Sequence, residues 1–141
     1  MSSITPLYTT TVTAHGGREG KVESADGHFK QTLSMPKSLG GPGGDGTNPE
    51  QLFAAGYSAC FESALRLVAR MQKIALTDAK ITATVTLGKN EAGKFQLAVE
   101  LVGDLPGLAP DVAQGLMTAA HGVCPYSEAT RNNIKVDLRL A

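Results

Sequence analysis

The sequence has little cysteine, no run of like charges and no long apolar stretch. No apolar stretch reaches the roughly 18 residues that a membrane-spanning helix requires. The first residues lack the basic segment followed by an apolar segment that marks a signal peptide. Thirteen basic residues balance thirteen acidic ones, which disfavours nucleic acid and an anionic membrane surface as partners. We therefore expect a cytoplasmic protein.

The two cysteines are the most informative residues of the chain. At 141 residues the chain can bury a hydrophobic core without cross-links. Cys60 lies in the apolar segment 52–61, whereas Cys124 lies in the segment 121–127. In the cytosol structural disulfides are rare, and those that form are usually transient and catalytic. The pair therefore suggests a redox couple, although a buried free cysteine is also a common small apolar filler.

Composition and periodicity predict one α+β domain over residues 1–141 with a mostly antiparallel sheet. β-branched and alternating segments indicate strands, and apolar residues at helical spacing indicate helices. A Gly- and Pro-rich segment, residues 36–48, reads as a long loop of the kind that is usually functional. The expected strands span residues 7–14, 21–24, 28–34, 80–88, 94–102 and 134–140, and the expected helices span residues 49–73 and 110–122, with a short turn up to 131.

The longest predicted helix, residues 49–73, is apolar nearly all round in its first half. A helix that is apolar on every face is buried on every face. In so small a domain this is easier to satisfy if a partner subunit covers one side.

A reactive Cys60 requires a nearby positive charge. Burial raises the pKa of a thiol, and Cys60 is too far along the helix for the helix dipole to lower it much. Arg18, flanked by Gly16, Gly17 and Gly20, is the candidate, because arginine keeps its charge when buried. Glu50 is the natural carboxylate to orient Arg18. Ten residues along a helix turn the chain by about 1,000°, so Glu50 and Cys60 lie within about 80° of each other.

Structural explanations for the same residues remain open. Glu50 has the spacing of a capping-box residue after Thr47, and Arg18 has the setting of an exposed turn residue. His121 and Cys124 have metal-ligand spacing and Cys60 could join them, but no Cys-x-x-Cys or second close histidine supports a zinc site.

Three segments, Gly16–Gly20, Gly40–Cys60 and Val123–Thr130, closely resemble those of the organic hydroperoxide resistance proteins. These proteins belong to the wider OsmC-like superfamily. The resemblance covers essentially the whole chain and implies an OsmC-like fold. It also implies an intertwined homodimer, with two long central helices packed against sheets from both chains and active sites at the subunit interface.

The resemblance assigns roles to four residues. Cys60 corresponds to the peroxidatic cysteine and Cys124 to the resolving cysteine, whereas Arg18 and Glu50 match the pair that positions the thiolate and the peroxide. The implied activity is the reduction of alkyl and fatty-acid hydroperoxides through a Cys60–Cys124 disulfide. The implied reductant is dihydrolipoamide on a lipoylated protein, with no bound cofactor or metal. The alternative is a non-catalytic cysteine redox sensor or binding module.

The aromatic residues of the long helix have two possible roles. Phe53, Tyr57 and Phe61 recur at helical spacing and are most simply core, although a wall around an apolar substrate would look the same. We expect these three and Tyr126 to contact the substrate, and Tyr126 and Ser127 to set the approach of Cys124.

Overall fold

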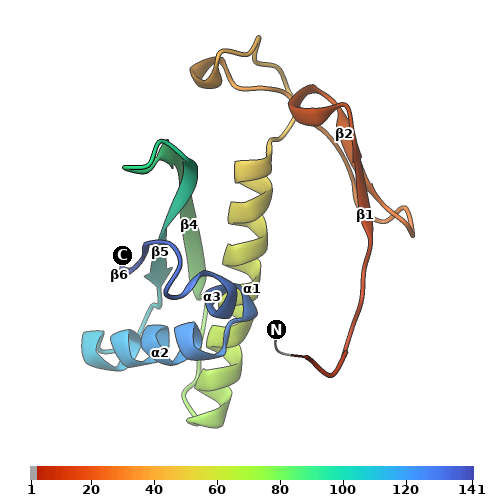
Figure 1. Ribbon diagram of the computed structural model, residues 1–141. Coiled ribbons are helices and arrows are strands. Elements are labelled where there is room, and N and C mark those ends of the chain that lie inside the picture. The colour runs from red at the N-terminus through yellow and green to blue at the C-terminus, as the bar shows by residue number, and fades with distance from the viewer. Residues whose placement is uncertain (1–2) are drawn as a thin grey trace. The chain divides into compact units, whose positions relative to one another are not determined.

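The computed structural model describes residues 3–141, which form two compact units, residues 3–49 and Glu50–Ala141. The single domain expected over residues 1–141 stays a prediction. Each unit is described by itself below, and Figure 1 labels most of the helices and strands.

The first unit contains a three-stranded antiparallel sheet in the order β1 (Val12–His15), β2 (Lys21–Ser24), β3 (Lys30–Thr32). A short 3-10 helix, η1 (Gly17–Glu19), joins β1 to β2. The first strand is shorter than the predicted residues 7–14, because its partner β2 provides only four residues before the turn at Asp26-Gly27. Within residues 3–141, residues 7–11 therefore lie outside the sheet.

The Gly-rich loop of the first unit is tied back to the sheet. After β3 the chain passes through η2 (Lys37–Leu39) and returns so that Leu33 and Thr47 form a parallel bridge. The backbone N–H of Gly46 donates to Ser34 Oγ at 2.8 Å. A Cβ on Gly46 would lie 2.6 Å from the carbonyl carbon of Leu33, so only glycine allows this close approach.

The long helix α1 (Pro49–Met71) matches the predicted helix closely. Proline is favourable in the first turn because its missing N–H would have no helical partner there. The helix ends where Lys73 takes a left-handed conformation (φ 59°) and the N–H of Ile74 donates to the carbonyl of Ala69 at 2.8 Å. Such a left-handed residue commonly terminates a helix.

The second unit packs α1 against a sheet in the order β4 (Lys80–Lys89), β5 (Phe95–Asp104), β6 (Val136–Leu140). Strands β4 and β5 form the predicted antiparallel hairpin, whereas β6 lies parallel to β5. The connection from β5 to β6 contains α2 (Pro110–Val123) and the short α3 (Pro125–Thr130). Of the four strand pairings that the structure describes, three are antiparallel, as predicted.

The hydrophobic core lies between α1, α2 and β5. Its fully buried members come from all three elements: Tyr57, Phe61, Leu65, Leu101, Leu116 and Met117. Cys124, between α2 and α3, is buried in the same cluster. The core therefore fixes the place where α3 begins.

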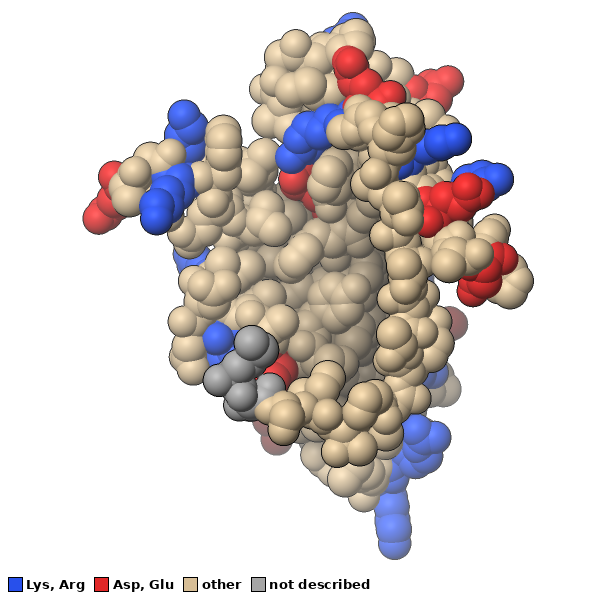
Figure 2. Space-filling view, turned by 45° about the vertical axis from the view of Figure 1, so that its right-hand side comes forward, with Lys and Arg blue, Asp and Glu red and all other residues tan. Residues whose placement is uncertain are grey.

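Figure 2 shows Lys and Arg residues beside Asp and Glu residues at several places on the surface. Within residues 3–141, none of the helices combines the length and hydropathy that crossing a bilayer demands.

Candidate redox site

The two cysteines, far apart in sequence, meet in the second unit. Cys60 lies on α1 and is partly buried, and Cys124 lies at the junction of α2 and α3 and is fully buried. Both are free thiols, and they lie close enough for Cys124 to raise the pKa of Cys60. The tertiary structure therefore places two thiols in contact without linking them.

The surroundings of Cys60 favour the neutral thiol. Burial is the main cause that raises the pKa of Cys60, and the hydrogen bond and electrostatic interaction with Cys124 raise it further. The backbone N–H of Tyr126 donates to the Cys60 sulfur and lowers the pKa. Because α3 carries this N–H and Cys124 precedes α3, one short segment supplies both of these contacts of the thiol.

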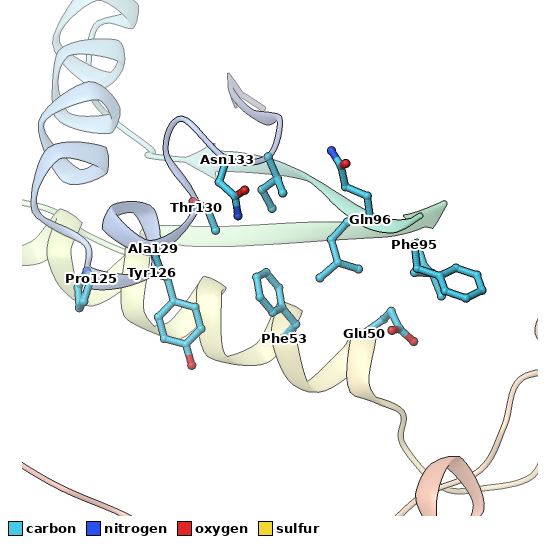
Figure 3. A pocket seen from close by; sticks show the side chains of 12 residues that line it. Glu50, Phe53, Phe95, Gln96, Pro125, Tyr126, Ala129, Thr130 and Asn133 are labelled. Carbon is cyan, nitrogen blue, oxygen red and sulfur yellow. The ribbon is translucent and has the colours of Figure 1, made fainter. Parts of the chain in front are cut away.

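A cavity of about 850 Å³ lies next to this segment in the second unit. Figure 3 shows Glu50 and Phe53 on α1, Phe95 at the end of the β4–β5 hairpin and Tyr126 on α3 around it. Its lining is mostly apolar: Phe53, Leu87, Phe95, Leu97, Pro125, Tyr126, Ala129 and Ile134, with Glu50, Gln96, Thr130 and Asn133 as the polar members. Tyr126 connects the two features, because its ring lines the cavity while its backbone contacts Cys60.

The four predicted substrate-contacting aromatic residues lie in two settings. Phe53 and Tyr126 line the cavity, with ring centroids 6.2 Å apart in an edge-to-face arrangement. Tyr57 and Phe61 are fully buried in the core. The ring centroids of Tyr57 and Tyr126 are 5.6 Å apart. The contact of all four with a substrate stays a prediction.

A glycine makes room for the Tyr126 ring on α1. A Cβ on Gly56 would lie 2.4 Å from the Tyr126 hydroxyl oxygen and 2.9 Å from its ring carbon Cζ. Real Cβ atoms essentially never approach other atoms so closely. The absence of a side chain at Gly56 therefore sets how closely α3 approaches α1 here.

Glu50 and Arg18 are placed by different units. Glu50 is in the first turn of α1, is half-buried and lines the cavity. Arg18 is half-buried on η1, in a turn that only glycine permits, because a Cβ on Gly20 would lie 1.8 Å from the carbonyl oxygen of His15. The predicted contacts of Arg18 with Glu50 and Cys60 stay predictions.

Several lining residues were not anticipated from the sequence. Leu87 and Leu97 are cross-strand partners near the end of the β4–β5 hairpin, where Phe95 is 76% exposed. The alternating pattern predicted the hairpin but not that its end would face α1. The one signal in the sequence is a phenylalanine close to the predicted turn, a place where side chains are usually exposed.

The histidine of the possible zinc site, His121, is directed towards a serine. His121 Nδ1 is 2.7 Å from Ser127 Oγ. Among residues 3–141, no group of three or more His, Cys, Asp or Glu side chains is arranged to hold a metal ion.

Comparison with known proteins places this arrangement in a family. Residues 41–139 match the model of the OsmC-like proteins. The chain is 51% identical over 136 residues to the organic hydroperoxide resistance protein of Xanthomonas axonopodis pv. citri, a match that covers 96% of this chain and 95% of that protein. The chain thus belongs to the OsmC-like family, within its organic hydroperoxide resistance branch.

Solved structures agree with this placement. An organic hydroperoxide resistance protein from Legionella pneumophila superposes with a TM-score of 0.92 at 52% identity, covering 97% of this chain and 99% of that one. OhrB of Bacillus subtilis superposes with a TM-score of 0.87 at 47% identity, covering 96% of this chain and all of that one. The predicted OsmC-like α+β fold is confirmed.

Proposed function

We propose that this chain is a thiol-dependent peroxidase that reduces organic hydroperoxides to alcohols. The observation that carries the proposal is the contact of two free thiols, Cys60 and Cys124, beside a largely apolar cavity. The names of the relatives, organic hydroperoxide resistance proteins, agree with such a reaction.

The proposed reaction begins at Cys60. Its thiolate sulfur attacks the terminal oxygen of the hydroperoxide, so that an S–O bond forms while the O–O bond breaks. The leaving alkoxide takes up a proton and departs as the alcohol, and the sulfur becomes a sulfenic acid. The Cys124 thiol then attacks this sulfur, water leaves, and a Cys60–Cys124 disulfide forms.

A dithiol completes the proposed cycle. Dihydrolipoamide on a lipoylated protein gives two electrons and two protons to the disulfide and becomes a cyclic disulfide itself. The protein needs no bound cofactor or metal for these steps. The proposed place of the reaction is the cytoplasm.

Arg18 and Glu50 are proposed to overcome the raised pKa of Cys60. A permanent positive charge stabilises the thiolate, and the same charge stabilises the oxygen that leaves as the O–O bond breaks. Glu50, which lines the cavity, would hold the planar guanidinium of Arg18 through a bidentate pair.

The cavity supports an apolar hydroperoxide as the substrate. Its volume of about 850 Å³ is within the range of small-molecule sites. Its apolar lining favours alkyl and fatty-acid hydroperoxides over hydrogen peroxide, because an alkyl chain gains free energy when it leaves water.

The exposed face of α1 supports a homodimer. Ala55, Ala59 and Ser63 are exposed and, at spacings of four residues, lie on one side of the helix. Small side chains allow another helix to approach closely. We propose a second copy of this chain as the partner that covers this side.

The first experiment adds one equivalent of an alkyl hydroperoxide to the reduced protein and measures the intact mass. Loss of two hydrogens, with a Cys60–Cys124 linked peptide, is expected, and hydrogen peroxide is expected to react more slowly. Cys60→Ser is expected to abolish the reaction, whereas Cys124→Ser stops at the sulfenic acid after one equivalent. An unchanged mass with both thiols still titratable would overturn the proposal. One oxidation without turnover by a dithiol would favour a redox sensor.

A further inference from the structure

A chain of hydrogen bonds behind the two thiols connects three helices. His121 Nδ1 on α2 is 2.7 Å from Ser127 Oγ on α3, and Ser127 Oγ is 2.8 Å from the hydroxyl of Tyr57 on α1. The Tyr57 hydroxyl is also 3.0 Å from Thr130 Oγ1. Tyr57 and Ser127 are fully buried and Thr130 is 5% exposed. Buried hydroxyls in a closed network of this kind fix the elements that carry them.

The hydrogens of the chain can be assigned by counting. Thr130 Oγ1 donates its hydrogen to the carbonyl of Ser127 at 3.3 Å, so it must accept from Tyr57. Tyr57 then accepts from Ser127, and Ser127 accepts from His121. His121 therefore carries a hydrogen on Nδ1 and starts the chain. Because the doubly protonated ring also carries this hydrogen, the bond to Ser127 does not depend on the charge of His121.

The network holds the segment that contacts Cys60. Ser127 is three residues after Cys124 and next to Tyr126, whose N–H reaches the Cys60 sulfur. Arg131, after α3, reinforces the same junction, because its Nη2 donates to the carbonyl of His121 at 2.6 Å. The hydrogen bond from Nδ1 to Ser127 is sufficient to explain the orientation of the His121 ring.

The charged groups around His121 are few. Arg131 is close enough to lower the pKa of His121, although burial is the larger cause. Glu128 on α3 forms an ion pair with Arg131. The positive charge near His121 is therefore balanced by a carboxylate.

We propose that His121 is a positioning residue that, through Ser127 and Tyr57, holds Cys124 and the Tyr126 N–H against Cys60. This inference rests on the proposed redox role of the two cysteines. In this role His121 affects the rate of disulfide formation and the ionisation of Cys60, and it does not contact the peroxide.

The test compares His121→Phe, which removes the donor, with His121→Asn, whose side-chain amide can donate from nearly the position of Nδ1. One readout is the rate of disulfide formation on addition of diamide, which needs no peroxide. The other is the pH profile of Cys60 alkylation by iodoacetamide, measured on the Cys60 peptide. His28→Asn, at an exposed histidine of the first unit, is the matched control.

His121→Phe is expected to slow disulfide formation about tenfold, which corresponds to the loss of roughly one hydrogen bond. It is also expected to move the alkylation midpoint to lower pH, because Cys124 raises the pKa of Cys60 more than the Tyr126 N–H lowers it. His121→Asn is expected to restore both. If folded His121→Phe behaves as the wild type, or if His121→Asn is as impaired as His121→Phe, the inference is wrong. If His121→Phe does not fold, Ser127→Ala removes the same link and takes its place.

The diamide readout separates this inference from the proposed function. A slow His121→Phe variant of a protein that does not reduce hydroperoxides would support the positioning role alone. A protein that reduces hydroperoxides with His121→Phe unimpaired in both readouts would support the peroxidase alone.

Discussion

At the scale of single residues, the chemistry of Cys60 depends on opposing influences on one sulfur atom. Burial and Cys124 raise its pKa, and the Tyr126 N–H lowers it. A raised pKa leaves the thiol protonated, and therefore unreactive, at neutral pH. A reactive Cys60 needs a positive charge that burial cannot neutralise, which is a property of arginine and not of lysine.

Arg18→Ala is expected to slow the alkylation of Cys60 at pH 7 by about tenfold or more, because each unit of pKa changes the thiolate fraction tenfold. Arg18→Lys keeps a charge without the planar fork and should be intermediate. The rate is measured with iodoacetamide across pH, after circular dichroism shows that both variants are folded. An Arg18→Ala profile equal to that of the wild type would mean that another group ionises the thiol.

Only part of the site could be predicted residue by residue. Cys60 and Cys124 were singled out because cysteine is scarce, and their pairing followed from the family resemblance. The hydrogen bond of Tyr57 with Ser127 could not be predicted, because its partners lie on different helices and no spacing relates them. Phe95 was missed because its place in the cavity lining depends on where the end of the β4–β5 hairpin lies.

At the scale of secondary-structure elements, the contact of α3 with α1 is set by Gly56. Gly56→Ala adds a methyl group 2.4 Å from the Tyr126 hydroxyl oxygen, so the ring of Tyr126 must move. Gly115→Ala on α2 is the matched control, because a Cβ there meets nothing within 4 Å.

We expect Gly115→Ala to stabilise the protein by roughly 0.5–1 kcal/mol, the usual gain of alanine over glycine within a helix. Gly56→Ala should lose this gain and, by displacing Tyr126, slow disulfide formation between Cys60 and Cys124. Urea unfolding and the diamide reaction measure the two effects. Equal stabilisation by both substitutions would show that the Tyr126 ring moves without cost.

The elements themselves were largely predictable where proline, glycine and periodicity agree. The helix predicted over residues 110–122 is observed over Pro110–Val123, because proline favours its first turn. Residues 7–11, predicted as part of a strand, lie outside β1, because strand propensity does not provide a pairing partner. The parallel pairing of β6 with β5 was not predictable, since alternation does not reveal strand direction.

At the scale of the whole molecule, the first unit has almost no core of its own. Within residues 3–49 only Ser24 and Leu33 are buried, and Leu7 and Tyr8 are 98% and 81% exposed. Exposed apolar residues of this kind are typical of surfaces that another chain covers. This agrees with the proposed homodimer.

The stability of the whole protein should depend on pH through His121. Burial and Arg131 lower the pKa of His121 in the folded state, so the unfolded chain binds a proton at higher pH than the folded protein does. Stability is therefore unaffected above the usual pKa of 6.5, falls as the pH drops below it, and levels off beneath the folded pKa.

His121→Asn should flatten this dependence, because asparagine does not titrate. The free energy of unfolding by urea, measured from pH 7.5 to pH 5 for wild type and variant, tests the expectation. Parallel curves for wild type and His121→Asn would contradict it.

The parallel pairing of β6 with β5 also determines the order in which the site is completed during synthesis. Cys124 and Tyr126, the two residues that contact Cys60, lie in the connection from β5 to β6, which this pairing closes. Chains fold from the N-terminus as they emerge, and pairings between distant segments form late. We expect that a nascent chain exposes Cys60 to oxidants before its partner thiol is in place. Newly made molecules would then be the ones most readily lost to irreversible oxidation of Cys60.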